Sequence, residues 1–302
     1  MRSIHILNPA AGLRKANLHV PEGIEVYETE GPRDMEKYIT DTCIKDPDVH
    51  FTVYGGDGSA HEAVNGIMSA GKAAIEKAIL SIVAKGSGND FVRNFSADKE
   101  FSGRVDVIKC NDRYGLNSIN IGFDCDVVVE TEKMKKNPLT SGSLGYIAGV
   151  LKVFSKKMGK EMTVSLKDKS GEVIRRSGEM LLTAVGNGRF CGGGFEFAPA
   201  AVLSDGCFDA LIVNNMKRLT FVKLILDYHN GKHVDRDTCL VRDKYKGLLG
   251  YYQCAEMTVE GISQYSIDGE LFDGDKAVIS IIPGALNVKM PALDLTKLCK
   301  KK

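Results

Sequence analysis

Short apolar runs alternate with segments of helical periodicity over the first third of the chain. Runs typical of β-strands lie at 4–7, 51–54 and 79–84, and the periodicity predicts helices over 33–44 and 59–69. This alternation predicts a parallel α/β sheet. Each apolar run ends in a polar or glycine-rich turn, and open α/β sheets bind ligands at the carboxyl ends of their strands. We therefore expect three turns to meet at one site.

Beyond Val105-Asp106-Val107 the pattern changes to short strand-like runs punctuated by glycine. Strands are expected at 162–166, 180–185, 256–260, 265–267 and 277–282, the last followed by Pro283-Gly284, and helices at 143–157 and 221–231. Because strands outnumber helices in this part, the pattern predicts a second domain that is mainly β.

Composition narrows the class of protein. With 302 residues, 43% of them hydrophobic, the chain can form about two domains. A net charge of +1 offers no overall field for nucleic acid, so no nucleic-acid partner is expected. Eight cysteines without a C-x-x-C pair indicate a reducing cytoplasm. The first residues lack the apolar stretch and small-residue cleavage site of a signal peptide, so no export is expected, and no apolar run approaches the roughly 18 residues of a membrane span.

The strongest candidate for phosphate binding is the turn at 55–62, Gly-Gly-Asp-Gly-Ser-Ala-His-Glu, which follows a strand and opens an amphipathic helix. Glycines allow close approach of the backbone, so consecutive N–H groups and the helix N-terminus can surround phosphate oxygens. Asp57 could then orient Mg²⁺ bound to those phosphates. The alternative is a tight strand-to-helix turn with Ser59 as N-cap.

Two further turns also follow apolar strands. Lys-Gly-Ser-Gly-Asn-Asp-Phe at 85–91 supplies small polar groups for a nucleotide, although in isolation it would be a loop capped by Asn89 or Asp90. Asn-Pro-Ala-Ala-Gly at 8–12 would in isolation be a plain strand exit. The occurrence of all three turns in this order favours a nucleotide site.

These turns carry a family resemblance. The order NPxxG, GGDGSxxE and GSGND resembles the catalytic domain of diacylglycerol kinase-type lipid kinases, which include soluble bacterial members and the sphingosine and ceramide kinases. Later segments are similar too: GNG at 186–188, GGG at 192–194, PAA at 199–201, LSDG at 203–206 and IDGE at 267–270. The resemblance therefore spans nearly the whole chain.

The resemblance implies an N-terminal α/β domain akin to NAD kinase and phosphofructokinase, a C-terminal β-sandwich-like domain and a nucleotide cleft between them. We expect the first domain to comprise residues 1–117 with a returning segment, 283–302, and the second to comprise 118–282. The implied ATP-contacting positions are Asn8, Pro9, Ala10, Ala11, Gly12, Thr29, Gly56, Asp57, Gly58, Ser59, Ala60, His61, Glu62 and Ser87. From the ordinary behaviour of histidine, His61 is expected to pack on the surface of the helix.

The resemblance also implies catalytic roles for three carboxylates. Asp57 and Asp90 would organise the catalytic Mg²⁺, and Glu270 would be the general base. A carboxylate suits that role, because phosphoryl transfer needs the acceptor hydroxyl positioned and its proton accepted. Without the resemblance, Glu270 would simply follow an Asp-Gly turn in a hairpin between the strands at 265–267 and near Ala277.

The loop at 202–207 resembles one that holds a structural magnesium in bacterial members through one aspartate and neighbouring backbone carbonyls. This implies Val202, Asp205 and Cys207 as ligands. One carboxylate is little for Mg²⁺, although that ion keeps several waters, so a metal-free β-turn is the alternative.

The sequence thus predicts a Mg-ATP-dependent lipid kinase that transfers the γ-phosphoryl group to a lipid hydroxyl, with diacylglycerol as the first choice of acceptor. The alternatives are a sphingoid- or ceramide-type lipid kinase, an NAD kinase, and a non-catalytic nucleotide- or lipid-binding protein. GGDG turns also mark NAD kinases, but the DGE and GNG–GGG pattern favours lipid kinases.

Such a kinase would meet its lipid transiently at a membrane, as a cytoplasmic protein peripheral to the inner membrane surface. Self-association as a homodimer is left open. Lysines between 133 and 160 and at 300–302 form basic intervals. An anionic bilayer attracts such residues with a free energy of ~1 kcal/mol each. Charged runs of this kind usually form a face that is simply exposed to solvent.

Overall fold

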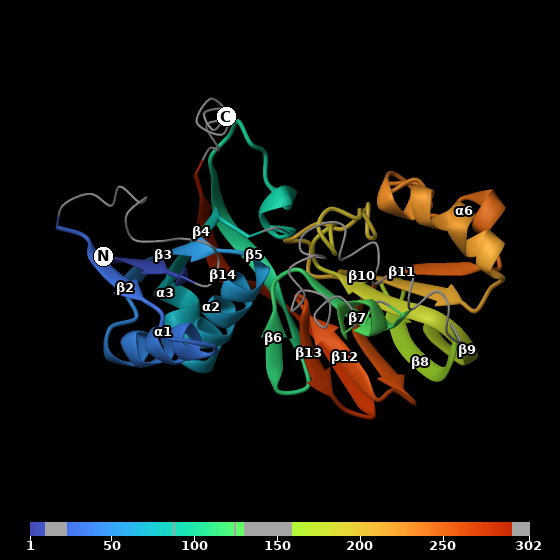
Figure 1. Ribbon diagram of the computed structural model, residues 1–302, viewed down its shortest axis with the longest axis horizontal. Coiled ribbons are helices and arrows are strands. Elements are labelled where there is room, and N and C mark those ends of the chain that lie inside the picture. The colour runs from blue at the N-terminus through green and yellow to red at the C-terminus, as the bar shows by residue number, and fades with distance from the viewer. Residues whose placement is uncertain (10–22, 87, 124, 130–158, 292–302) are drawn as a thin grey trace, which may run out of the picture.

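The computed structural model describes residues 1–9, 23–86, 88–123, 125–129 and 159–291. Within these residues the strands join into one 14-stranded sheet, whose main path is β13-β12-β7-β9-β10-β11-β14-β4-β3-β1-β2. Helices α1 to α3 gather at one end of the molecule, and strands β7 to β13 form the other (Figure 1). The predicted α/β N-terminal region and mainly β C-terminal region are confirmed.

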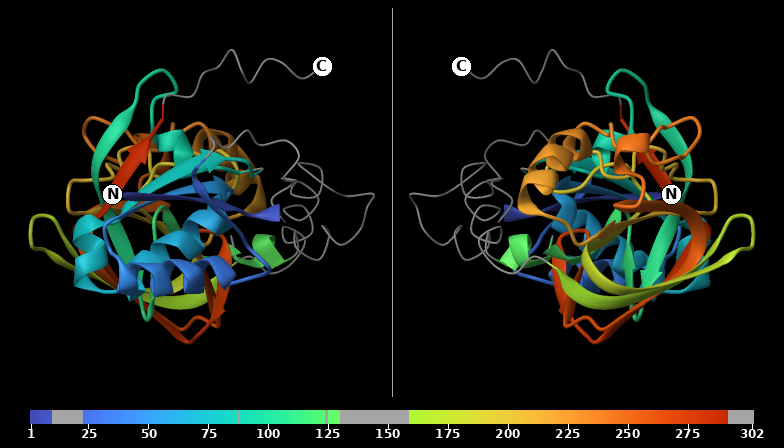
Figure 2. Two further views of the ribbon diagram at one scale, coloured as in Figure 1. Left: turned by 90° about the vertical axis from the view of Figure 1, so that its left-hand side faces the viewer. Right: turned by 90° about the vertical axis from the view of Figure 1, so that its right-hand side faces the viewer.

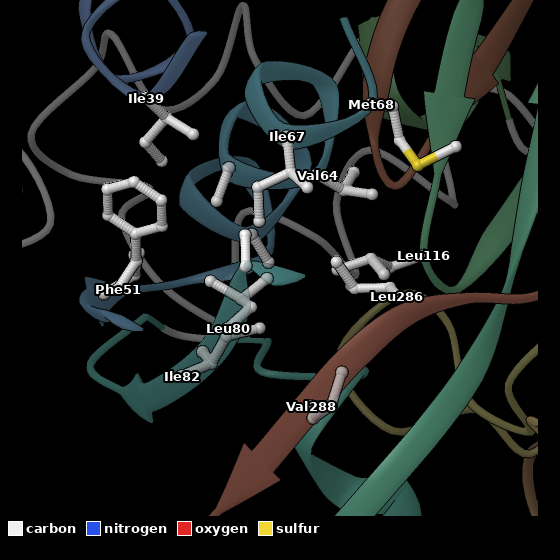
Figure 3. Close-up of a cluster of buried hydrophobic side chains, with 14 of the residues drawn as sticks. Ile39, Phe51, Val64, Ile67, Met68, Leu80, Ile82, Leu116, Leu286 and Val288 are labelled. Atoms are coloured by element: carbon white, nitrogen blue, oxygen red, sulfur yellow. The ribbon is translucent and has the colours of Figure 1, made fainter. Parts of the chain in front are cut away.

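The N-terminal part of the sheet is parallel. Its strands are β1 (Arg2–Leu7), β2 (Glu25–Glu28), β3 (Val49–Gly55) and β4 (Ile79–Ala84), in the order β2-β1-β3-β4. Its helices are α1 (Asp34–Lys45), α2 (Asp57–Ser69) and α3 (Lys72–Lys77). Apolar side chains at alternate strand positions pack against one stripe of each helix. Ile39 of α1, Phe51 of β3, Ile67 of α2 and Leu80 of β4 are buried in one cluster with Leu286, near the chain's end (Figure 3).

The C-terminal part is built from antiparallel strands. They are β5 (Phe101–Cys110), β6 (Arg113–Gly115), β7 (Ser118–Gly122), β8 (Lys160–Asp168), β9 (Val173–Gly186), β10 (Phe208–Asn214), β11 (Leu249–Glu260), β12 (Gln264–Ile267) and β13 (Glu270–Asp273). Strand β8 pairs with both β9 and β11, and β10 lies between those two, so the four strands form a closed circuit. One apolar cluster fills its interior, and a second lies beneath helix α6 (Arg218–His229).

Strand β14 (Lys276–Met290) connects the two parts. Its first residues pair antiparallel with β11, and Asn287 and Val288 pair parallel with β4. The expected strand at 277–282 therefore does not end at Pro283-Gly284. The register against β5 shifts between Ile282 and Leu286, because a bulge accommodates a proline that has no N–H for the ladder.

Other elements differ from expectation mainly in length. The expected strands at 162–166, 180–185 and 256–260 are parts of the longer β8, β9 and β11, and the helix expected at 221–231 is α6. The helix expected at 143–157 lies outside the described residues. None of the described helices is both long and apolar enough to cross a membrane.

Candidate functional site

Two glycine turns pack backbone against backbone at the carboxyl ends of β3 and β4. A Cβ atom added at Gly86 would lie 2.6 Å from the Cα atom of Gly56, and one added at Gly56 would lie 3.0 Å from the Cα atom of Gly86. Neither position has room for a side chain. Glycine is therefore required at both, and the GGDG and GSGND turns meet as predicted.

Asp57 fastens the second turn to the first. Helix α2 begins at Asp57 with Gly56 as N-cap, so Ser59 lies inside the helix and does not cap it. The Oδ1 atom of Asp57 accepts hydrogen bonds from the backbone N–H groups of Asp90 at 2.7 Å and Phe91 at 3.3 Å. Burial, followed by the nearby Asp90, raises the pKa of Asp57 to about 6.

Asp90 is a second buried carboxylate, and it connects the two parts of the molecule. Its Oδ2 atom accepts a hydrogen bond of 2.8 Å from the backbone N–H of Gly193, in the GGG segment. Its Oδ1 atom has no hydrogen-bond partner among the described residues, and the Nε atom of Arg93 lies 3.6 Å away. Burial raises the pKa of Asp90 as well.

Glu270 approaches this pair from the C-terminal part. It begins β13, directly after a two-residue turn in which Asp268 and Gly269 have φ values of 51° and 91°. The hairpin partner of β12 is thus β13 and not the strand near Ala277. A Cβ atom added at Gly58 would lie 2.8 Å from the Oε1 atom of Glu270. The glutamate carboxylate therefore faces the first turn of α2 at Gly58, the residue after Asp57.

Asp268 holds this hairpin in place, a role that the sequence did not suggest. Its buried carboxylate accepts hydrogen bonds of 2.8, 2.8 and 3.0 Å from the backbone N–H groups of Leu116, Asn117 and Ser118. The Nδ1 atom of His61 lies 3.4 Å from its Oδ2 atom. His61 is 2% exposed, so the expectation that it packs on the helix surface is wrong.

The remaining predicted ATP-contacting residues differ in their surroundings. The Nδ2 atom of Asn8 donates to the Oγ atom of Ser59 at 2.9 Å, which joins the first turn to α2. The backbone N–H of Thr29 donates to the carbonyl of Leu7 at the end of β1. Pro9 is exposed at the same strand end.

Two other predicted positions, Ala60 and Glu62, do not present free side chains. Ala60 is buried in the core, and Glu62 accepts a hydrogen bond of 2.9 Å from the backbone N–H of Arg33. Residues 10–12 and Ser87 lie outside the described residues.

The 202–207 loop, the predicted structural metal site, is held by Asp106. The two carboxylate oxygens of Asp106 accept hydrogen bonds from the backbone N–H groups of Gly206 at 2.8 Å and Gly284 at 2.6 Å. In Asp205, Oδ1 accepts from the backbone N–H of Cys207 at 3.1 Å, and Oδ2 lies 3.9 Å from the Nζ atom of Lys169.

The chemistry of this loop bears on whether a metal fits. Val202 is 51% exposed, and the predicted site needs only the backbone carbonyls of Val202 and Cys207, because Mg²⁺ takes oxygen ligands. No group of three or more His, Cys, Asp or Glu side chains able to hold a metal occurs in the described part of the chain. Magnesium in this loop would depend on one carboxylate and backbone carbonyls, and it stays a prediction.

Two family models match the chain, and they meet near the point where the α/β pattern gives way to the mainly β pattern. Residues 4–116 match the diacylglycerol kinase catalytic domain, and residues 117–290 match the YegS C-terminal NAD kinase beta sandwich-like domain. Together the two models cover the parallel sheet with both glycine turns and the antiparallel part that carries Glu270.

Individual relatives match over most of their length. A protein of Alcanivorax borkumensis named "Probable lipid kinase YegS-like" is 28% identical over 271 residues, which are 85% of this chain and 84% of the relative. A protein of Pseudomonas aeruginosa with the same name is 28% identical over 249 residues, or 79% and 75% of the two chains. The crystal structure of a diacylglycerol kinase from Bacillus anthracis superposes with a TM-score of 0.65 at 20% identity, over 95% and 96% of the chains.

Proposed function

Because this chain belongs to a lipid kinase family whose members join a diacylglycerol kinase catalytic domain to a YegS C-terminal NAD kinase beta sandwich-like domain, we propose that it transfers the γ-phosphoryl group of ATP to the hydroxyl of diacylglycerol. The observation that carries the proposal is the approach of the Glu270 carboxylate to Gly58, the residue after Asp57, at the helix start where Asp57 is bonded to the backbone of Asp90. Two carboxylates at a phosphate-binding turn, opposite a third, suit metal-assisted phosphoryl transfer to a hydroxyl.

Asp57 and Asp90 are the groups that would hold Mg²⁺. Both are buried, burial raises the pKa of each, and the Oδ1 atom of Asp90 lacks a hydrogen-bond partner among the described residues. Buried carboxylates in this state are stabilised by a cation, and carboxylate oxygens are the ligands that Mg²⁺ prefers. When bound, the ion neutralises charge on the phosphate oxygens.

The start of α2 provides the phosphate site. The backbone N–H groups of Gly56 to Gly58 stand at a helix N-terminus, where the helix dipole favours an anion. The absence of side chains at Gly56 and Gly86 lets the two turns touch, and the absence of one at Gly58 leaves room for the Glu270 carboxylate beside the start of the helix.

Glu270 accepts the proton of the acceptor. As the lipid oxygen forms its bond to the γ-phosphorus, the bond from that phosphorus to the bridging oxygen of ADP breaks and the hydroxyl proton passes to the Glu270 carboxylate. Its carboxylate faces Gly58 at the start of α2, where the proposed phosphate site lies, and this supports the role.

A transfer assay tests the proposal. Purified protein with Mg²⁺ and γ-labelled ATP is offered diacylglycerol, monoacylglycerol, sphingosine, ceramide and NAD in separate reactions. Labelled phosphatidic acid, which disappears when Mg²⁺ is omitted, is the expected product. Labelling of sphingosine or ceramide would correct the acceptor but keep the lipid kinase. Labelling of NAD alone, or ATP binding without transfer to any acceptor, would contradict the proposal.

A further inference from the structure

Helix α6 has two apolar faces, and one of them is exposed. Phe221, Leu224 and Tyr228 are buried in the cluster beneath the helix. Leu219, Val222 and Leu226 follow the same spacing on the other side, and they are 79%, 49% and 67% exposed. A surface helix needs only one apolar stripe to pack on its protein, so the second stripe is unexplained by folding.

The exposed stripe is narrow and has basic borders. At about 100° per residue, Val222, Leu226 and Leu219 fall within about 60° of one another, on roughly the opposite side from the buried stripe. Arg218 and Lys223, both exposed, lie about 40° beyond its two edges. Their long side chains can place their charges beside the apolar strip in the manner of snorkelling residues.

Asp227, the single acidic residue of α6, is engaged by residues outside the helix. Asp227 is paired with Lys244, and the hydroxyl of Tyr245 donates to its Oδ2 atom at 2.8 Å. These contacts lower the pKa of Asp227, so it stays ionised and engaged on its own side of the helix. The outward surface made by Leu219, Val222 and Leu226 with Arg218 and Lys223, the α6 outer face, therefore combines apolar and basic side chains.

We propose that the α6 outer face docks onto the surface of an anionic lipid bilayer. The inference rests on the proposed function, because an enzyme whose acceptor is a membrane lipid must stay at the bilayer while it captures that lipid. Apolar side chains of an amphipathic helix enter the boundary between head groups and acyl chains, and flanking cations attract anionic lipid. Figure 1 places α6 at the end of the molecule away from α1, and the right-hand view of Figure 2 shows it on the outside of that end.

A second copy of the chain fits this face less well. Two copies meeting through the same face would bring Arg218 and Lys223 of each against those of the other, which is repulsive. Three side chains of one helix also offer far less than the ~800 Å² per partner that a stable interface needs. Anionic head groups provide both the complementary charge and a surface that needs no shape match.

Vesicle sedimentation of the full chain tests the proposal. Vesicles of phosphatidylcholine with and without phosphatidylglycerol are mixed with wild type, with Leu219→Glu/Leu226→Glu and with the charge-preserving Leu219→Ser/Leu226→Ser. The matched control is Val173→Glu/Val278→Glu, which alters valines 74% and 48% exposed on β9 and β14. We expect both α6 variants to lose at least tenfold in affinity for the anionic vesicles, while the control binds as wild type does.

Phosphorylation separates this inference from the function on which it rests. The α6 variants should phosphorylate short-chain diacylglycerol dispersed in detergent at the wild-type rate and lose activity only on vesicles. If wild type phosphorylates no lipid but its vesicle binding still depends on α6, docking stands and the kinase assignment fails. Vesicle binding unchanged in the α6 variants would overturn the proposal. A shift in oligomeric state in those variants, measured by sedimentation velocity, would overturn it in favour of self-association.

Discussion

The contact between the two glycine turns requires that Gly56 and Gly86 have no side chains. The two turns touch through their Cα atoms, and the space that a methyl group would need is occupied by backbone, which cannot rotate away as a side chain can. The carboxylates of Asp57 and Asp90 come together because this contact brings their turns within hydrogen-bond reach.

Gly86→Ala should therefore separate the turns. Its Cβ atom would meet the Cα atom of Gly56 at 2.6 Å, so we expect a loss of about 1–3 kcal/mol in the free energy of unfolding and weaker ATP binding. Gly31→Ala is the control, because no atom lies within 4 Å of its added Cβ. Urea unfolding and ATP titration measure the two effects. Wild-type values for Gly86→Ala would show that the turns are not in contact.

The ionised form of Asp57 lowers the free energy of unfolding, so its effect on stability depends on pH. Burial raises its folded-state pKa from 3.8 to about 6, so the folded protein holds this proton more tightly than the unfolded chain does. The resulting stabilisation is complete below about pH 4 and is lost as the pH rises through about 6. Without a bound cation, the ionised carboxylate therefore destabilises the protein at neutral pH.

Asp57→Asn should remove this pH-dependent cost. In the absence of Mg²⁺ and nucleotide, we expect the variant to be more stable than wild type by on the order of 2–3 kcal/mol near pH 8, and by almost nothing near pH 4. It should also lose phosphoryl transfer. Asp209→Asn is a useful control, since burial raises the pKa of that carboxyl to about 7, and this variant should gain stability without losing activity. A variant of Asp57 less stable than wild type near pH 8 would refute this account.

At the scale of elements, the β12–β13 hairpin carries Glu270, the proposed general base, to the start of α2. Its turn is fastened by Asp268 to three consecutive backbone N–H groups, from Leu116 to Ser118, at the start of β7. Because Glu270 follows Asp268 by two residues, a small movement of the turn would displace its carboxylate.

Asp268→Asn is expected to loosen this hairpin. An amide has one acceptor oxygen, so at least one of the three buried N–H groups loses its partner, at about 1–3 kcal/mol. We expect kcat to fall about tenfold or more while the KM for ATP changes little, because the proposed nucleotide contacts lie on other elements. Asp273→Asn, at the exposed end of β13, should leave both constants unchanged. An equal loss in kcat and in ATP affinity would point instead to general disruption.

The local pattern of apolar residues predicted the limits of strands that end in clear turns. It missed the limits of strands that continue beyond their apolar residues. The strand expected at 79–84 lies in a mainly apolar run between Lys77 and Lys85, and it agrees with β4 in the structure. β11 and β14 extend beyond their apolar runs, because cross-strand pairing continues through polar or bulged positions that have no apolar period. Asp268 was missed for a different reason. Its partners are separated from it by about 150 residues, and no local spacing encodes that contact.

At the scale of the molecule, one sheet joins the two parts that the site requires. Strand β14 pairs with β11 through its first residues and with β4 near its end, so the part that carries Glu270 and the part that carries Asp57 belong to one hydrogen-bonded sheet. Asp90 adds a direct link through Gly193. Family motifs in the sequence predicted the three carboxylates, whereas the connection that brings them together is a property of the whole sheet.

The most direct test of the account is the rate of γ-phosphoryl transfer from Mg-ATP to diacylglycerol by wild type and by Glu270→Gln. The amide keeps the size of the side chain but cannot accept the hydroxyl proton, so we predict a rate lower by roughly 10²–10⁴-fold with ATP affinity retained. Asp273→Asn should match wild type in the same assay. Transfer by Glu270→Gln at the wild-type rate, or no transfer by wild type, would contradict the account.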